Sequence, residues 1–428
     1  MKRVLMVAYH FPPLAGSSGI QRTLRFVQQL PAHGWQPLVL GAHPRAFERS
    51  SDDLDGDVPS GTVVRRAFAL DTARHLSLGG RYPEVLARPD RWMSWRFDAV
   101  RQGLKMVREF RPDVLWSTYP IATAHLIGAE LQRRTGLPWI ADFRDPMAQE
   151  GYPADRATWR AFSDIERQAA TQASRCCFTT PGAAAIYRAR YPAAAQRMAV
   201  LENGFDEDSF AAAEAALAVA PPSQRGPLSP GRLTLLHSGV VYPDERDPAA
   251  LIEALARLKA ADASIAGRLR VRFRAAVHDA LLRELAQRHG VDDMVELLPP
   301  VAYRAALAEM LRADGLLVMQ AANCNEQVPA KIYEYLRARR PILCLSDPQG
   351  DTCAVLRRAG IARHARLDDA AGIAALLGAF VAGDDHGLRP EARSIASASR
   401  AARTAQLAAW LDGCLRPDAA ARTAGVPA

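Results

Sequence analysis

The chain has 428 residues, of which 49% are hydrophobic and 23% are charged. It is therefore too long for one ordinary hydrophobic core, and apolar enough to bury two. The longest apolar runs, such as residues 3–8, fall far short of the roughly 20 residues that span a bilayer. The net charge of +8 favours an anionic partner, which a nucleotide, an anionic lipid or a nucleic acid would satisfy.

The first residues contain a basic pair and a short apolar run, but Tyr9-His10-Phe11-Pro12-Pro13 follows where a secretory signal needs a longer apolar region. We expect a first strand there, and a cytoplasmic protein. The six cysteines show no repeated CxxC spacing, which indicates neither a disulfide framework nor a zinc site.

Short strand-like runs alternate with amphipathic stretches through the first half of the chain. Ile20, Leu24, Val27 and Leu30 recur at helical spacing and predict a helix from Gly19 to Gly34. The strands are expected at residues 3–8, 36–40, 114–117, 139–142, 175–179 and 198–201. This alternation is typical of a doubly wound parallel sheet.

A second α/β alternation follows an alanine-rich run and a Pro/Gly-rich stretch. Its strands are expected at residues 233–237, 270–275, 295–298, 315–320 and 341–345, with helices at 248–260, 279–289, 302–313 and 329–338. The stretch 390–415 is expected to be helical, and the last dozen residues frayed. We expect an N-terminal Rossmann-like domain (1–210), a linker (211–231), a C-terminal Rossmann-like domain (232–390), and a helix and tail (391–428) that packs back toward the first domain.

Such sheets bind ligands at the carboxyl ends of their strands, so we expect the functional polar groups in the strand-to-helix loops. The loop after the first strand contains Gly16-Ser17-Ser18-Gly19 and opens onto a helix. Small residues and free N–H groups there would suit a phosphate or a sugar oxygen, which makes Gly16 and Gly19 candidate donor-binding residues. The alternative is a loop that only needs glycine to turn.

Three charges follow the apolar pair Trp139-Ile140, namely Asp142, Arg144 and Asp145. Charges at the end of a buried strand are costly unless a cleft solvates them or they pair. They indicate either the active cleft or a structural Asp–Arg pair.

In the second half, Gly239 follows a predicted strand and Arg246 lies in the next loop. A glycine turn with a nearby guanidinium suits a diphosphate, because the guanidinium can bind two oxygens at once. The alternative is a solvated arginine.

The most informative segment is Asn325 to Leu336. Pro329 marks the first turn of a helix, so Glu326 precedes the helix, and Lys331 and Glu334 share one side of it at i, i+3. One carboxylate could then face a sugar and the other a ribose diol, with Lys331 near the phosphates. The alternative is an amphipathic helix with an ordinary ion pair.

These residues resemble a known family. Glu326 and Glu334 match the E-x7-E pattern of retaining GT-B glycosyltransferases, particularly glycosyltransferase family 4, and Asn203-Gly204-Phe205-Asp206 and Ala313-Asp314 resemble further motifs of that family. The resemblance spans roughly residues 1 to 400. It implies a GT-B fold, which consists of two Rossmann-like doubly wound parallel-sheet domains facing across a cleft.

The resemblance also implies roles. Glu334 would bind the donor ribose and Glu326 the donor sugar, while backbone amides near Val328 would support the sugar and phosphate. Arg246 stands near the family's phosphate-binding lysine, but Val240 replaces its arginine, and we expect Lys331 to supply that cation. The expected catalytic residues are Asp142, Arg144, Asp145, Arg246, Lys331 and Glu326; the expected donor-binding residues are Gly16, Gly19, Gly239, Val328 and Glu334.

The implied function is transfer of a sugar from a nucleoside-diphosphate sugar to an acceptor hydroxyl, with retention and without a metal or a cofactor. Cell-surface polysaccharide or glycolipid synthesis is the expected setting. A sugar-nucleotide epimerase on the same fold, or a non-catalytic nucleotide or glycan binding protein, remains an alternative. No nucleic-acid-binding module is recognised, and no nucleic acid is expected as a partner.

The segment Arg88 to Arg111 combines Trp92, Trp95 and Phe97 with seven basic residues. Such a segment could lie on an anionic membrane at the inner face, where a lipid-linked acceptor would be found. The alternative is a solvated helix whose Val100, Leu104 and Val107 pack on the sheet.

Overall fold

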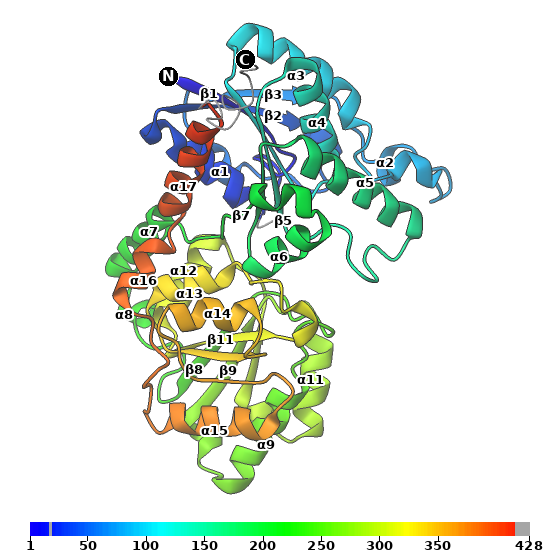
Figure 1. Cartoon of the computed structure of the whole chain (residues 1–428). Coiled ribbons are helices and arrows are strands. Elements are labelled where there is room, and N and C mark those ends of the chain that lie inside the picture. The colour runs from blue at the N-terminus through cyan, green and yellow to red at the C-terminus, as the bar shows by residue number, and fades with distance from the viewer. Residues whose placement is uncertain (17–18, 416–428) are drawn as a thin grey trace, which may run out of the picture. The chain divides into compact units, whose positions relative to one another are not determined.

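The computed structural model describes residues 1–16 and 19–415, and the chain divides into two compact units (Figure 1). Unit 1 consists of Met1–Glu202 and the segment from Arg403 onward, and unit 2 of Asn203–Ala402. The expected frayed end lies largely in 416–428, outside the described residues. No helix in the described ranges is both long and apolar enough to cross a bilayer.

The first crossing between the units comes before the linker expected at 211–231. That stretch begins inside helix α7 (Glu207–Val219) and continues through α8 (Pro222–Arg225), both in unit 2. Asp206 caps α7 by accepting a 3.0 Å hydrogen bond from Ser209 N, and Phe210 is fully buried in the core of unit 2. A capped helix with a buried aromatic residue belongs to the domain that it packs on.

Unit 1 is built on a seven-stranded sheet with the order β3-β2-β1-β4-β5-β6-β7, in which every pairing is parallel. Its strands are β1 (Lys2–Val7), β2 (Trp35–Ala42), β3 (Val63–Ala67), β4 (Val114–Thr118), β5 (Trp139–Arg144), β6 (Arg175–Phe178) and β7 (Met198–Val200). The edge strand β3 was not predicted, because Val-Val-Arg-Arg-Ala shows neither alternation nor a continuous apolar run.

Both faces of this sheet are buried. On β1, Leu5 and Val7 pack into one core cluster, while Val4 and Met6 pack into the other. The two-residue period of a strand thus sends alternate side chains to opposite helical layers. The helices of unit 1 are α1 (Gly19–Gln29), α2 (Thr72–His75), α3 (Trp95–Phe110), α4 (Thr123–Thr135), α5 (Arg156–Gln172), α6 (Pro181–Arg190) and most of α17 (Arg400–Cys414).

Helix α3 corrects one expectation about aromatic residues. Trp95 is fully buried and Trp92 is partly buried against the same core, so neither is presented to a membrane; only Phe97 is exposed. Val100 is buried, and Leu104 and Val107 pack on the core, as the solvated-helix alternative required.

The C-terminal helix α17 packs on unit 1 beside α1 (Figure 1). The indole nitrogen of Trp35 donates a 2.9 Å hydrogen bond to Oδ1 of Asp412, Lys2 forms an ion pair with the same carboxylate, and Thr404 bonds Gln29. Leu407 and Leu411 are fully buried in the core cluster that also contains β1.

Unit 2 repeats the topology with six parallel strands in the order β10-β9-β8-β11-β12-β13. The strands are β8 (Leu233–Ser238), β9 (Leu269–Arg274), β10 (Val295–Leu298), β11 (Gly315–Gln320), β12 (Ile342–Ser346) and the unpredicted β13 (His364–Ala365). Besides α7 and α8, the helices of this unit include α9 (Ala249–Ala261), α11 (Asp279–Arg288), α12 (Tyr303–Arg312), α13 (Lys331–Ala338), α14 (Asp351–Arg358), α15 (Ala370–Val381) and α16 (Ala392–Ser397).

Both sheets confirm the doubly wound α/β class. In each, the strand order reverses beside the first strand, between β1 and β4 in unit 1 and between β8 and β11 in unit 2. Ligands of such sheets bind at the carboxyl ends of the strands at this reversal. The loops after β1, β4, β8 and β11 are therefore the expected positions of the ligand-binding residues.

Candidate active site

In unit 2, the turn after β8 has a backbone that only glycine accommodates well. Gly239 has a φ of +125°, and a Cβ added to it would lie 2.7 Å from Nζ of Lys331. The glycine therefore supplies the turn and also leaves room for the lysine head group. Lys331 opens α13, so the strand end and the helix N-terminus meet at this point.

Lys331 is held by a histidine from β8. Its Nζ lies 3.2 Å from Nε2 of His237, whose Nδ1 lies 3.1 Å from the carbonyl oxygen of Leu317. A carbonyl can only accept, so Nδ1 carries the proton and Nε2 accepts from the lysine. Burial, reinforced by Lys331, lowers the pKa of His237 well below its usual range, and the histidine is neutral.

Arg246 provides a second cation near Lys331. Its Nη1 donates a 2.8 Å hydrogen bond to the carbonyl of Val240, and the guanidinium lies 5.2 Å from the ring centroid of Tyr242. Its Nε is buried without a hydrogen-bond partner among the described residues. Burial and the charge of Arg246 lower the pKa of Lys331 from 10.5 to about 7. Two crowded cations at a helix N-terminus favour an anionic ligand.

Glu334 lies on the same side of α13 as Lys331. Its Oε1 accepts a 2.8 Å hydrogen bond from the hydroxyl of Tyr303, the first residue of α12. Burial raises the pKa of Glu334 above its ordinary range, although Tyr303, Arg400 and Lys331 oppose this shift. A half-buried carboxylate with one oxygen held by a tyrosine is suited to accept from hydroxyl groups on its other oxygen.

Glu326 lies half-buried in the loop before α13, and Val328 is buried in a core cluster. The loop is tied to α14, since Asp351 N donates to Asn325 O at 2.8 Å and Thr352 Oγ1 donates to Gln327 O at 3.1 Å. Unit 2 thus brings Gly239, Arg246, Lys331 and Glu334 to one edge, with the Glu326 loop anchored before α13. The sequence had not indicated His237 or Tyr303 as their supports.

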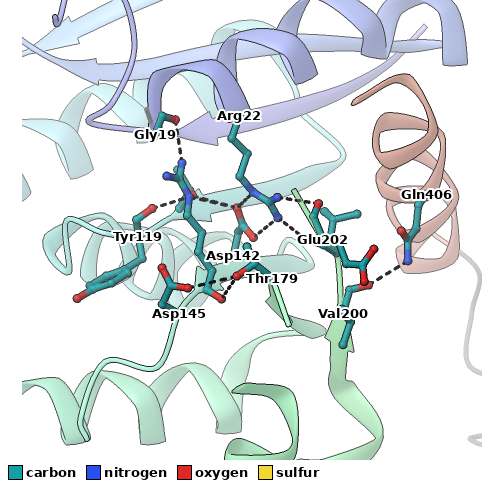
Figure 2. A network of polar contacts seen from close by, with 12 residues as sticks. Gly19, Arg22, Tyr119, Asp142, Asp145, Thr179, Val200, Glu202 and Gln406 are labelled. Atoms are coloured by element: carbon teal, nitrogen blue, oxygen red, sulfur yellow. Dashed lines mark hydrogen bonds and ion pairs between the residues drawn. The ribbon is translucent and has the colours of Figure 1, made fainter. Parts of the chain in front are cut away.

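In unit 1, Asp142 at the end of β5 is fully buried and paired with Arg22 of α1 (Figure 2). Arg22 donates from Nε to Oδ2 at 2.9 Å and from Nη2 to Oδ1 at 2.8 Å. Burial alone would raise the pKa of Asp142, but Arg22 outweighs it and holds that pKa below its ordinary range. This is the structural Asp–Arg pair left open by the sequence, with Arg22 as the arginine. Arg144 Nε lies 3.9 Å from Asp142.

Arg144 links the end of β5 to the start of α1. Its Nη2 donates a 3.1 Å hydrogen bond to the carbonyl of Gly19, and its Nε donates to Oγ1 of Thr118 at 3.0 Å (Figure 2). Its φ of +63° is uncommon for a residue with a side chain and is a form of strain found at functional sites. Asp145 accepts from Thr179 Oγ1 at 3.2 Å, and burial raises the pKa of this carboxyl group.

The glycine loop of unit 1 is described only in part. Gly16 is exposed with a φ of +79°, and Gly19 begins α1, whereas Ser17 and Ser18 lie outside the described residues. His10 enters the same loop; burial and the charge of Arg144 lower its pKa from 6.5 to about 3. Unit 1 therefore gathers Gly19, Arg144 and His10 at the carboxyl end of its sheet, supported by the buried Arg22–Asp142 pair.

Comparisons with known proteins identify a domain match and the fold. Residues 18–204 match the family model of the glycosyl transferase 4-like domain. The matched residues lie almost entirely in unit 1. No curated protein matches the sequence.

Solved structures share the architecture of the whole chain. The HepE protein of Anabaena, crystallised with UDP and glucose, aligns with a TM-score of 0.65 and 14% identity over 96% of this chain and 100% of its own. A UDP-forming trehalose-phosphate synthase from Burkholderia xenovorans aligns with a TM-score of 0.66 and 11% identity over 97% of this chain and 100% of its own. A glycosyltransferase from Rickettsia africae aligns with a TM-score of 0.63 and 10% identity over 97% of this chain and 99% of its own. The fold is GT-B, and by family domain and fold the protein is a glycosyltransferase.

Proposed function

We propose that this glycosyltransferase moves a sugar from a nucleoside-diphosphate sugar to an acceptor hydroxyl, with retention of the anomeric configuration. The observation that carries the proposal is that two cations, Lys331 and Arg246, lie at the same edge of unit 2 as the carboxylate of Glu334. Lys331 and Arg246 would hold the diphosphate, and Glu334 would accept from the ribose hydroxyls. The E-x7-E spacing and the UDP and UDP-glucose complexes of HepE support a nucleotide-sugar donor.

In this proposal, donor binding restores the charges of two side chains that burial tends to neutralise, Lys331 and Glu334. Burial drives Lys331 toward its neutral form and Glu334 toward its protonated form. A diphosphate beside Lys331 restores its charge, and hydroxyl donors beside Glu334 stabilise its carboxylate. The site is therefore better satisfied with a nucleotide than without one.

The reaction breaks the bond between the anomeric carbon and the phosphate oxygen and forms a bond from that carbon to the acceptor oxygen. Negative charge grows on the departing diphosphate, where Lys331, Arg246 and the N-terminus of α13 would stabilise it without a metal or a cofactor. Glu326 would hold the transferred sugar. Arg144, Asp145 and Gly19 of unit 1 are proposed to bind the acceptor.

The test is a thermal-shift screen of nucleoside-diphosphate sugars, starting with UDP-glucose, on the wild type and on Glu334→Ala. A specific donor should raise the melting temperature of the wild type and have little effect on the variant. If no sugar nucleotide shifts the wild type, the proposal fails. Proton NMR of the glycoside then reads the anomeric configuration, and inversion would refute retention.

The same assays separate the two alternatives. Epimerised sugar nucleotide without a glycoside would identify an epimerase. Donor binding that survives Glu334→Ala, with no turnover on any acceptor, would identify a binding protein. We propose a cytoplasmic location and a role in cell-surface polysaccharide or glycolipid synthesis, with an acceptor that is lipid-linked.

A further inference from the structure

A short lobe of unit 1 presents apolar side chains to solvent. The lobe consists of residues 74–86; it begins at the end of α2 and includes most of the 3-10 turn Glu84–Ala87. Figure 1 shows the α2 region extending sideways from the sheet of its unit. Leu78 is 90% exposed, Val85 67%, Leu86 44% and Leu76 41%. Four of the fourteen large hydrophobic residues that are exposed in the described chain fall within these few positions, so this concentration is a feature of the lobe.

The lobe has a fixed base. Thr72 Oγ1 donates to the carbonyl of Leu86 at 2.8 Å and is 3.0 Å from that of Arg91, which draws the two ends of the lobe together. Leu78 and Arg81 form an antiparallel bridge at its tip. These backbone contacts therefore hold four apolar side chains in water within one short segment, which makes the lobe a candidate contact surface.

Positive charge is concentrated around the lobe in the sequence. Residues 65–111 contain eleven Lys and Arg against five Asp and Glu, so this segment carries +6 of the chain's net +8. On α3, Phe97, Arg101, Lys105 and Arg108 are exposed at spacings that place them on one face. Arg65, Lys105 and Arg108 line a shallow hollow of about 570 Å³ together with Gln102 and Glu109, and Glu109 pairs with Arg65 at 2.8 Å.

We propose that the 74–86 lobe docks unit 1 on the surface of an anionic lipid bilayer. Its leucines and valine would enter the boundary between head groups and acyl chains, and the exposed cations of the segment, Arg81 in the lobe and Lys105 and Arg108 on α3, would be attracted to the anionic head groups. Charge complementarity favours this occupant over a second copy of the chain. A two-fold interface through the lobe would bring Arg74 and Arg81 of one copy against the same residues of the other, with Glu84 as the lobe's one acidic residue, which is unfavourable.

This inference deepens the proposed function, because it names the surface on which a lipid-linked acceptor would be met. Vesicle binding does not depend on sugar transfer, however, so the two fail separately. It also replaces the surface expected from sequence, since Trp92 and Trp95 pack into the core and the lobe takes their place.

The experiment is co-sedimentation of the full chain with vesicles of phosphatidylglycerol or of phosphatidylcholine at low salt. The wild type should bind the first and not the second. The double variant L78S/V85S should bind about tenfold more weakly, because it loses apolar surface that inserts. Its matched control is V219S, which removes a side chain that is 86% exposed in unit 2 and should bind like the wild type.

Failure of the wild type to bind phosphatidylglycerol vesicles overturns the proposal, and so does equal binding by L78S/V85S. A dimer in light scattering that is lost in L78S/V85S would assign the lobe to a second copy and also overturn it. The UDP-glucose thermal shift is measured on the same proteins. A retained shift in L78S/V85S shows that the variant is folded and that loss of docking is separate from donor binding.

Discussion

The hydroxyl of Tyr303 donates a 2.8 Å hydrogen bond to Oε1 of Glu334, and so joins the first residue of α12 to the first turn of α13. The bond fixes the rotamer of a carboxylate whose burial disfavours its charge. The tyrosine therefore acts as a positioning residue for Glu334. Removal of its hydroxyl should lower the affinity for the donor more than it lowers the stability of the fold.

Tyr303→Phe is expected to weaken binding of UDP-glucose by about tenfold, which corresponds to the lower end of the range for a lost hydrogen bond to a carboxylate, about 1.5 kcal/mol. Isothermal titration calorimetry measures this change. Because the bond also opposes the rise in the pKa of Glu334, the affinity of the variant should fall off at a higher pH than that of the wild type as the solution is acidified. Tyr82→Phe, outside the site, is the control, and equal affinities for the wild type and Tyr303→Phe would rule out the positioning role.

Lys331 gives a second prediction, through pH. Its pKa near 7 lies below the ordinary lysine value, so the free protein loses this cation above pH 7. Binding of a diphosphate requires the charged form and must then take up a proton. The affinity for UDP-glucose should fall by up to about tenfold per pH unit above 7, and calorimetry in buffers of different ionisation enthalpy should show proton uptake.

The control for that titration is Lys331→Arg, because a guanidinium stays charged throughout this range. Its affinity should be almost independent of pH between 6 and 9. A wild-type profile as flat as that of Lys331→Arg would contradict the prediction. For stability the sign is opposite, since the unfolded chain binds the extra proton between pH 7 and the ordinary lysine pKa, and the free energy of unfolding should gain from Lys331 as pH rises through that window.

Gly239→Ala tests the close approach of the lysine. The new Cβ would meet Lys331 Nζ at 2.7 Å, and the positive φ adds backbone strain of about 1–3 kcal/mol. Gly231→Ala is a matched control, because Gly231 also has a positive φ of +78° but open space around the added Cβ. Both variants should melt at lower temperature, and only Gly239→Ala should lose UDP-glucose binding. Equal donor affinity in the two variants would mean that the displaced lysine does not bind the donor.

The buried Arg22–Asp142 pair predicts a large effect on stability. Arg22→Ala should cost about 3–5 kcal/mol, because it leaves an uncompensated carboxylate in the core. Arg167→Ala, which removes an exposed i, i+3 pair with Asp164, should cost under about 1 kcal/mol. Chemical denaturation measures both. The double variant Arg22→Ala/Asp142→Ala should be less destabilised than the sum of the single variants, and strict additivity would argue against the pair.

Asp142→Asn separates the structural role of this residue from the catalytic role expected from sequence. The amide keeps the shape of the side chain and removes its charge. If Asp142 acts only through Arg22, the loss of transferase activity should follow the loss of stability. An inactive variant with an unchanged melting temperature would restore a catalytic role.

Most strands of the two sheets could be predicted from the sequence alone. The buried strands of Rossmann-like sheets are recognisable in a sequence as short apolar runs. The strands from β8 to β12 were each expected near their observed positions. The two misses have a common cause. β3 and β13 lie at sheet edges, where one neighbouring strand is absent and the apolar run that marks a central strand is not required.

For the site, the local pattern identified the residues but not their partners. Glu334 and Lys331 were recognisable from their spacing on one helix, whereas Tyr303 and His237 reach them from elements about thirty and ninety positions earlier. Arg22 lies two positions after Ile20 and off the apolar stripe of its helix, so nothing in the local sequence marked it as the partner of a buried carboxylate. Contacts between distant elements leave no local pattern, so they become visible only when the fold is known.

Helix α17 also constrains how the protein is made. Asp412 receives Trp35 and Lys2, and Leu411 completes a core that contains β1. Unit 1 is therefore assembled from segments on either side of unit 2, and its core cannot close during synthesis until α17 has emerged from the ribosome. Unit 2, encoded between them, can fold during synthesis. A truncated gene product that stops after unit 2 would leave unit 1 with an open core and expose it to aggregation or proteolysis.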